Sequence, residues 1–253
     1  MANPKIILSS GPAELTTSCG LLHYEMVRSR RRSLQISIRD SLTVRVCAPR
    51  LLPQKEIERF LRQKAAWVFR KLGEVQERRD ILAAKKYEDG SEFLFLGRPY
   101  RLAVSWNGLK TARIAFDESG WTAFLPDGTA PEKISRQIKD ALVKWYRAQA
   151  LEVLGGRIFH YARIMGLEPL KITVRTQKRL WGSCHHRAKS INLNWLLILA
   201  PMDVIDYVVV HELCHLKVPN HSRRFWSCVG RVLPDFRERR QWLKTNATDM
   251  VLP

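Results

Sequence analysis

The sequence predicts an α+β fold in which a β-rich N-terminal region precedes a C-terminal domain of helices and a small sheet. Three observations support this prediction. Apolar and polar residues alternate through residues 34–46, apolar residues follow a helical period over 54–79, and a longer helical pattern begins at Pro131. We therefore expect a β-rich region at 1–128 that contains one long helix, and a second domain at 129–253.

The first half of the chain is expected to consist of hairpins and one inserted helix. The alternating residues at 34–46 lie on both sides of Arg39–Ser41, which would form the turn of a hairpin. Pro53 opens the helical pattern over 54–79. Short β-prone runs at 93–125 are separated by Gly-Arg-Pro, Asn-Gly and Ser-Gly, which are typical of turns and predict further hairpins.

The second half begins with a long amphipathic helix that runs from Pro131 and ends at Gly166. Two strands are predicted after it, at 170–177 and 191–195. The sequence LWGSCHHRAKS between them is expected to be a turn or loop, in which Gly182 would permit a tight turn.

Two more helices are predicted near the C-terminus. The valine-rich sequence APMDVIDYVVVHELCHLKV is too long for a typical strand, and its length favours a helix. Asp203 follows Pro201 as the expected N-cap, and Pro219 would end the helix. A last helix is expected to begin near Ser222.

Composition argues against a membrane protein and against a disulfide-stabilised secreted domain. Of the 253 residues, 45% are hydrophobic, but no segment approaches the ~20 consecutive apolar residues of a membrane-spanning helix. The N-terminus lacks the pattern of a secretory signal. The five cysteines are scattered without CxxC spacing, which is typical of reduced thiols. We expect a cytoplasmic protein with no membrane contact.

The chain is strongly basic, with 43 Lys and Arg against 24 Asp and Glu and a net charge of +19. This excess favours polyanionic partners, above all nucleic acid, although a solvated basic surface explains it equally well. No acidic residue lies between Glu168 and Asp203. The basic residues of that segment are Lys171, Arg175, Lys178, Arg179, Arg187 and Lys189.

The sequence VVVHELCHLKVPNHSRRFW at 208–226 contains a candidate metal site. On a helix, His211 and His215 would lie on one face, where both can bind one ion such as Zn²⁺. Glu212 would lie beside the ion and could take a proton from metal-bound water. His221 is the candidate third ligand, and three protein ligands leave the fourth position open, as in catalytic zinc sites. Three core or surface histidines are the structural alternative, and Cys214 is interpreted as a small core residue.

Several segments resemble the YgjP-like metallopeptidase domain, a family related to the SprT-like and WLM zinc peptidases. They are RTQKRLWGSC (175–184), INLNWLLILAP (191–201), VIDYVVVHELCHLKVPNHSRRFW (204–226) and LPDFRERRQWLK (233–244), with RSRRRSLQISI and FLGRPYRL in the first half. The resemblance implies a minimal zincin core at 129–253: a helix, a small sheet, an active-site helix and a third-ligand helix. It also implies His211, His215 and His221 as zinc ligands and Glu212 as the catalytic base.

The resemblance further implies that residues 189–195 form the edge strand that pairs with an extended peptide. This chain departs from related patterns at three places. Metzincins share the HExxHx5H spacing but have glycine where this chain has Val218, alanine would be usual at Cys214, and a small polar residue would be expected where His185 and His186 stand.

The roles of three residues are left open by the sequence. His185 and His186 would contact the substrate, stabilise an oxyanion or be exposed loop residues. Tyr207, one helical turn before His211, would donate a hydrogen bond to the transition state or pack in the core.

The function that we expect is a zinc-dependent metallopeptidase. The hypothesis for its substrates is that they are acidic peptides, or proteins held on nucleic acid. One alternative is a nucleic-acid-binding protein with a structural or vestigial metal site. Another is a metal-dependent endoribonuclease of the YbeY-like type, which Glu212 disfavours because such proteins typically lack a glutamate after the first histidine.

Overall fold

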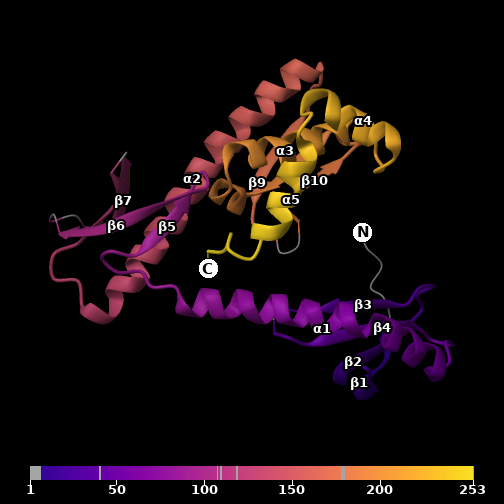
Figure 1. The fold of residues 1–253 in the computed structure, drawn as a ribbon. Coiled ribbons are helices and arrows are strands. Elements are labelled where there is room, and N and C mark those ends of the chain that lie inside the picture. Colours follow the sequence, from indigo (N-terminus) through magenta and orange to yellow (C-terminus); the bar gives the residue numbers. More distant parts are fainter. Residues whose placement is uncertain are drawn as a thin grey trace. The chain divides into compact units, whose positions relative to one another are not determined.

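A computed structural model describes residues 7–39, 41–106, 108, 110–117, 119–177 and 180–252 (Figure 1). Contacts divide the chain into two compact units, Met1–Ala83 and Ala84–Pro253. The strands at 92–125 therefore belong to the same compact unit as the C-terminal helices, whereas the domain boundary expected after residue 128 stays a prediction. Within the described residues, no helix has both the length and the apolar character needed to cross a membrane.

The first unit is a four-stranded sheet covered by one long helix. The strand order is β1-β2-β4-β3, and the predicted hairpin is confirmed by antiparallel pairing of β3 with β4. The turn residue Asp40 lies outside the described residues. The bounds of the elements are Ile7–Thr17 for β1, Gly20–Ser29 for β2, Gln35–Ile38 for β3, Val44–Pro49 for β4 and Gln54–Ala84 for helix α1.

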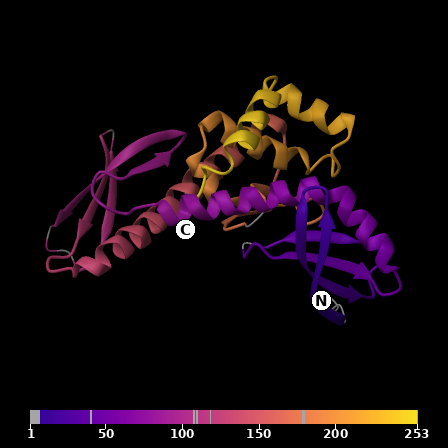
Figure 2. The same cartoon turned by 60° about the horizontal axis from the view of Figure 1, so that its bottom comes forward.

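Helix α1 confirms the predicted helix and extends five residues beyond its expected end at 79. Figure 2 shows it lying along one face of the sheet. Ile57, Leu61 and Val68 from α1 and Val46 from β4 are fully buried in one apolar cluster. The helical period and the strand alternation therefore face each other across this core.

A second four-stranded sheet opens the second unit, in the order β5-β6-β8-β7. The predicted hairpins are confirmed, because β5 with β6 and β7 with β8 are antiparallel, whereas β6 and β8 are parallel. Asn107, in one of the predicted turns, lies outside the described residues. The bounds are Glu92–Phe95 for β5, Arg98–Trp106 for β6, Arg113–Asp117 for β7 and Gly120–Leu125 for β8.

Aromatic side chains join this sheet to helix α2, which spans Pro131–Met165. Trp121 is 1% exposed and makes an edge contact with Trp145 of α2, with ring centroids 4.6 Å apart. The predicted end of the helix is confirmed, since Gly166 is its C-cap with a left-handed backbone, φ 61°.

A three-stranded sheet follows in the order β10-β11-β9. The predicted strands correspond to β9 (Lys171–Arg175) and β11 (Ser190–Asn194). However, the expected loop contains a further strand, β10 (Gly182–His185), which pairs antiparallel with β11. The expectation that 189–195 form the edge is therefore wrong. Strand β11 is central, and β10 and β9 are the two edge strands. Residues 182–185 lack the alternating apolar pattern that predicts a strand.

The helix predicted from the valine-rich sequence is shorter than expected. Helix α3 spans Met202–Cys214, after a 3₁₀ helix at Trp195–Leu199. The N-cap is Pro201 and not Asp203, which lies in the first turn, and the helix ends before Pro219. The physical reason is that chain reversal begins after His215, where Lys217 and Val218 both donate hydrogen bonds to the carbonyl oxygen of Cys214.

Two helices complete the second unit, grouped with α3 around β9 and β10 (Figure 1). Helix α4 spans Arg223–Val232 with Ser222 at its N-cap position, which confirms the predicted start. Helix α5 spans Phe236–Asn246 and was not separately predicted. Helix α3 contacts α2, α4, α5 and β10, so nearly all of its residues are buried.

Candidate metal centre

Three histidine side chains converge at the C-terminal end of α3. The Nε2 atom of His221 lies 3.0 Å from Nε2 of His211 and 3.2 Å from Nε2 of His215. One nitrogen from each ring belongs to a set whose members all lie within 4.8 Å of one another. The structure therefore brings together the three residues that the sequence predicted as ligands.

The chain reversal after α3 places His221 beside the other two rings. Leu216, Lys217 and Val218 each donate a backbone hydrogen bond to the last turn of α3, which folds the chain back. Nδ1 of His215 lies 3.0 Å from the carbonyl oxygen of Val218. Because a carbonyl oxygen only accepts, Nδ1 of His215 must carry the proton, and a neutral His215 directs the lone pair of Nε2 toward His221.

Aromatic residues of α4 form a wall around the three imidazoles. Phe225 is fully buried, and its ring centroid lies 4.8, 4.4 and 4.8 Å from those of His211, His215 and His221. Trp226 stacks on His221 at 5.7 Å. These contacts restrict the orientation of each imidazole and exclude water from one side of the site.

The electrostatic environment favours neutral imidazoles. Burial, reinforced by His215 and His221, lowers the pKa of His211 to about 3. Burial also lowers the pKa of His215. Nδ1 of His211 is buried and, within the described residues, has no hydrogen-bond partner. Neutral imidazole nitrogens that face one another at 3.0–3.2 Å form a donor set that fits a divalent cation such as zinc.

Glu212 is buried beside this cluster, with 5% of its surface exposed. Its carboxyl has no hydrogen-bond or ion-pair partner in the part of the chain that the structure describes. Burial therefore raises its pKa to about 8. A carboxyl with this pKa can exchange a proton near neutral pH, which is the chemistry expected of a general base.

Gly182 on β10 makes room for Glu212. A Cβ atom at this glycine would lie 2.6 Å from Cγ of Glu212, which is far closer than packing allows. Gly182 belongs to a strand, so the expectation that it permits a tight turn is wrong. Its physical role is to let the strand approach the glutamate. No local sequence pattern indicates this contact, because it depends on how β10 packs against α3.

The structure also places the three residues whose roles the sequence left open. Nδ1 of His186 lies 3.2 Å from the carbonyl oxygen of His215, whereas Nδ1 of His185 accepts a hydrogen bond from the backbone of Ala188 within the β10–β11 turn. Tyr207 is 5% exposed, and its ring centroid is 5.8 Å from that of His211. Of the three, His186 and Tyr207 lie against metal-site residues.

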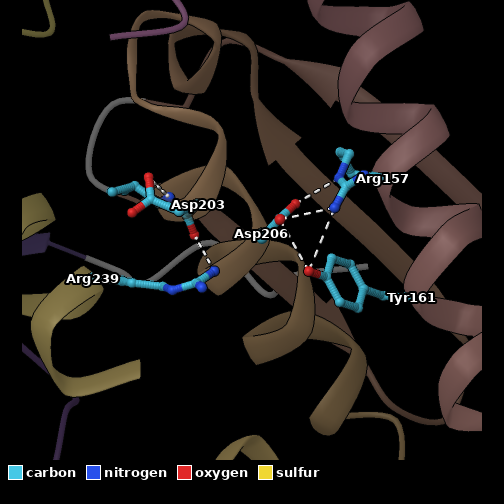
Figure 3. Close-up of polar contacts among 6 residues, drawn as sticks. Arg157, Tyr161, Asp203, Asp206 and Arg239 are labelled. Atoms are coloured by element: carbon cyan, nitrogen blue, oxygen red, sulfur yellow. Dashed lines mark hydrogen bonds and ion pairs between the residues drawn. The ribbon is translucent and has the colours of Figure 1, made fainter. Parts of the chain in front are cut away.

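Polar contacts hold α3 in place on two sides (Figure 3). Asp206 accepts hydrogen bonds from Nε and Nη2 of Arg157 at 2.6 and 2.8 Å and from the hydroxyl of Tyr161 at 3.0 Å. On the other side, Arg239 of α5 donates to the carbonyl oxygen of Asp203 at 2.9 Å. This network was not predicted, although the sequence contains one signal of it: Asp206 is the only charged residue in the apolar run VIDYVVV.

Two comparisons with known proteins gave matches, one with a family model and one with a solved structure. The model of the family described as YgjP-like, metallopeptidase domain, matches residues 32–246. Among solved structures, the crystal structure of the metallopeptidase zymogen of Pyrococcus abyssi abylysin matches with 23% sequence identity and a TM-score of 0.35. That match covers 37% of this chain and 93% of the abylysin chain. Among proteins with curated descriptions, none matches.

The Arg157–Asp206 pair generates a prediction about stability. Asp206→Asn is expected to lower the free energy of unfolding by about 2–3 kcal/mol, since it leaves a guanidinium with 28% side-chain exposure without its carboxylate. Chemical denaturation measures the change. The matched control is Asp140→Asn, which removes an exposed ion pair of α2 and is expected to change stability by less than about 0.5 kcal/mol. Equal effects of the two substitutions would contradict the assignment.

The buried carboxyl generates a prediction about pH. In the metal-free protein, the pKa of Glu212 is raised from 4.5 to about 8, so the folded state holds this proton more tightly than the unfolded state. Its contribution to stability is complete below pH 4.5 and is lost as the pH rises through about 8. The melting temperature of Glu212→Gln minus that of the wild type should therefore increase from pH 5 to pH 9.

Both the wild type and Glu212→Gln contain His211. The effect of its titration therefore cancels when the two melting temperatures are subtracted. Glu152→Gln, on the exposed surface of α2, serves as the control for replacing a glutamate with glutamine. Parallel pH profiles for the wild type and Glu212→Gln would show that Glu212 titrates as an ordinary carboxyl.

Proposed function

This chain belongs to the YgjP-like metallopeptidase family, and from that premise we propose that it is a zinc-dependent peptidase with His211, His215 and His221 as ligands and Glu212 as catalytic base. The family implies a divalent metal. The observation that carries this proposal is the convergence of three imidazole Nε2 atoms next to the buried carboxyl of Glu212, which has no partner among the described residues. Neither feature alone would indicate hydrolysis, whereas together they supply a metal site and a base.

The donor set supports zinc. Three imidazole ligands suit borderline cations, and three protein ligands leave one position open for water or substrate. When bound there, zinc would supply Lewis-acid polarisation of the substrate carbonyl and of a water molecule. The protein contributes the rigid placement of the ligands through Phe225 and the hydrogen bond from His215 to Val218.

Glu212 would move the proton that hydrolysis requires. A nearby cation favours the ionised carboxyl, which offsets the effect of burial on its pKa. The carboxylate would accept a proton from the attacking water and transfer it to the leaving nitrogen. Its apolar surroundings and the close approach of Gly182 leave it little freedom to turn away.

Strand β10 is the proposed docking edge for the peptide. Within the described residues it pairs with β11 alone, so its outer backbone groups can pair with an extended chain. Gly182 lies at one end of this strand beside Glu212, and the other end leads to the turn at 186–189. A peptide paired with β10 would therefore pass the carboxyl and reach this turn.

The turn gives a reason for a preference for acidic substrates. His186, Arg187 and Lys189 are exposed and line a hollow together with Leu216 and residues 166–168, which follow α2. Glu168 is the acidic residue in this lining. Lys178 and Arg179, which also belong to the acid-free segment, lie outside the described residues. Excess positive charge beside the docking edge would attract acidic side chains.

The first prediction from this proposal concerns metal and catalysis together. Purified protein is expected to bind about one zinc per chain, and His215→Ala should lose it. Glu212→Gln should keep the zinc and lower the rate of casein cleavage by about 10²–10⁴-fold, as expected for loss of a general base. Elemental analysis and proteolysis on the same samples measure both effects.

The control is His23→Ala, which removes an exposed histidine of the first unit and should change neither quantity. Absence of zinc after zinc is supplied would refute the metal site. Zinc without cleavage that depends on Glu212 would instead favour the nucleic-acid-binding alternative.

The second prediction concerns substrate charge. Peptides with aspartate in place of asparagine upstream of the cleaved bond should be cleaved with a higher kcat/KM, and added salt should reduce the advantage. Arg187→Gln and Lys189→Gln should each reduce the preference about 2–5-fold, as expected for exposed charge pairs. The matched control is Lys133→Gln, an exposed lysine in the first turn of α2. Cleavage that is insensitive to salt and to peptide charge would contradict the idea.

A further inference from the structure

Two cysteines lie in contact across the helices that form the metal centre. The thiol of Cys214, on α3, donates to the sulfur of Cys228, on α4, with the two Sγ atoms 3.1 Å apart. Both are free thiols. Because the sulfurs of a disulfide are about 2.05 Å apart, only a small approach separates this pair from a covalent bond.

The two thiols differ in their access to solvent. Cys214 is fully buried, whereas Cys228 is partly exposed. A reagent in solution can therefore reach Cys228 first. Cys214, which faces it from inside the protein, is positioned to react next.

The segment between these cysteines contains most of the metal centre. Residues 214–228 include His215, His221 and Phe225, whose ring contacts all three histidines. A covalent bond between Cys214 and Cys228 would close this segment into a loop and restrict the departure of His221 from α3.

We propose that Cys214 and Cys228 are a disulfide-forming site for low-molecular-weight disulfides, and that the crosslink holds the third-ligand segment against α3. In the first step, the Cys228 sulfur attacks the reagent disulfide, forms a mixed disulfide and releases one reagent thiol. In the second step, the Cys214 sulfur attacks the Cys228 sulfur and releases the second reagent thiol. The two cysteines lose two electrons and two protons, and the reagent gains both.

The experiment treats the full-length chain with oxidised glutathione and maps its tryptic peptides without reduction. Cys214 lies in peptide 190–217 and Cys228 in peptide 225–231. The expected product is these two peptides joined, lighter by two hydrogens than their sum. In a variant with serine at Cys19, Cys47 and Cys184, the thiol count should fall from two to none.

Single substitutions test the order of the steps. Cys214→Ala should trap glutathione on Cys228, whereas Cys228→Ser should leave Cys214 unmodified. Circular dichroism of each variant establishes that it is folded. Glutathione attached to Cys228 in the wild type without a joined peptide would overturn the proposal, as would a joined peptide that contains Cys184 instead.

The second readout rests on the proposed metal site. Zinc-loaded protein should release its metal to EDTA more slowly after oxidation, and Cys228→Ser treated in the same way should show no change. If the completely crosslinked protein and the reduced protein release zinc at equal rates, the proposal that the crosslink holds the third-ligand segment against α3 would be overturned. If the chain binds no zinc, the proposed function fails, whereas the peptide map still decides whether the disulfide forms.

Discussion

The structure depends on the burial of helix α3. Neighbouring elements enclose this helix, and it must still present His211 and Glu212 toward the histidine cluster at its C-terminal end. From Val204 to Val210 every residue of the helix is buried, and α2, α4, α5 and β10 all contact it. Two residues of the candidate metal centre, His211 and Glu212, therefore lie on a helix that has little freedom to rotate or slide. A small rotation would carry His211 and Glu212 away from His221, which comes from a separate segment.

Polar contacts fix the register of this helix where apolar packing alone would leave it free. Valine and isoleucine side chains of similar shape can repack after a small shift, whereas the fork of hydrogen bonds between Arg157 and Asp206 fits one position. The bond from Arg239 to the carbonyl oxygen of Asp203 fixes the other side of the first turn. Such pairs contribute modest net stability but strong positional specificity.

Burial makes charged side chains unfavourable in the candidate site. It raises the pKa of the Glu212 carboxyl to about 8 and lowers the pKa of the His211 imidazole to about 3, so both groups favour their neutral forms. In the proposed enzyme, a divalent cation would reverse this balance, since it attracts both the nitrogen lone pairs and the carboxylate.

The amino-acid sequence determined those features that depend on neighbours within one helix or one hairpin. The four-residue spacing placed His211 and His215 together, the period over 54–79 gave α1, and Ser222 marked the start of α4. Only the tertiary structure decided that β10 is an edge strand, that Gly182 gives space to Glu212, that Asp206 pairs with Arg157, and that Cys214 meets Cys228. The physical reason is that periodicity encodes contacts three or four residues apart, whereas these contacts join elements that are distant in the chain and that meet only when the sheet and helices pack.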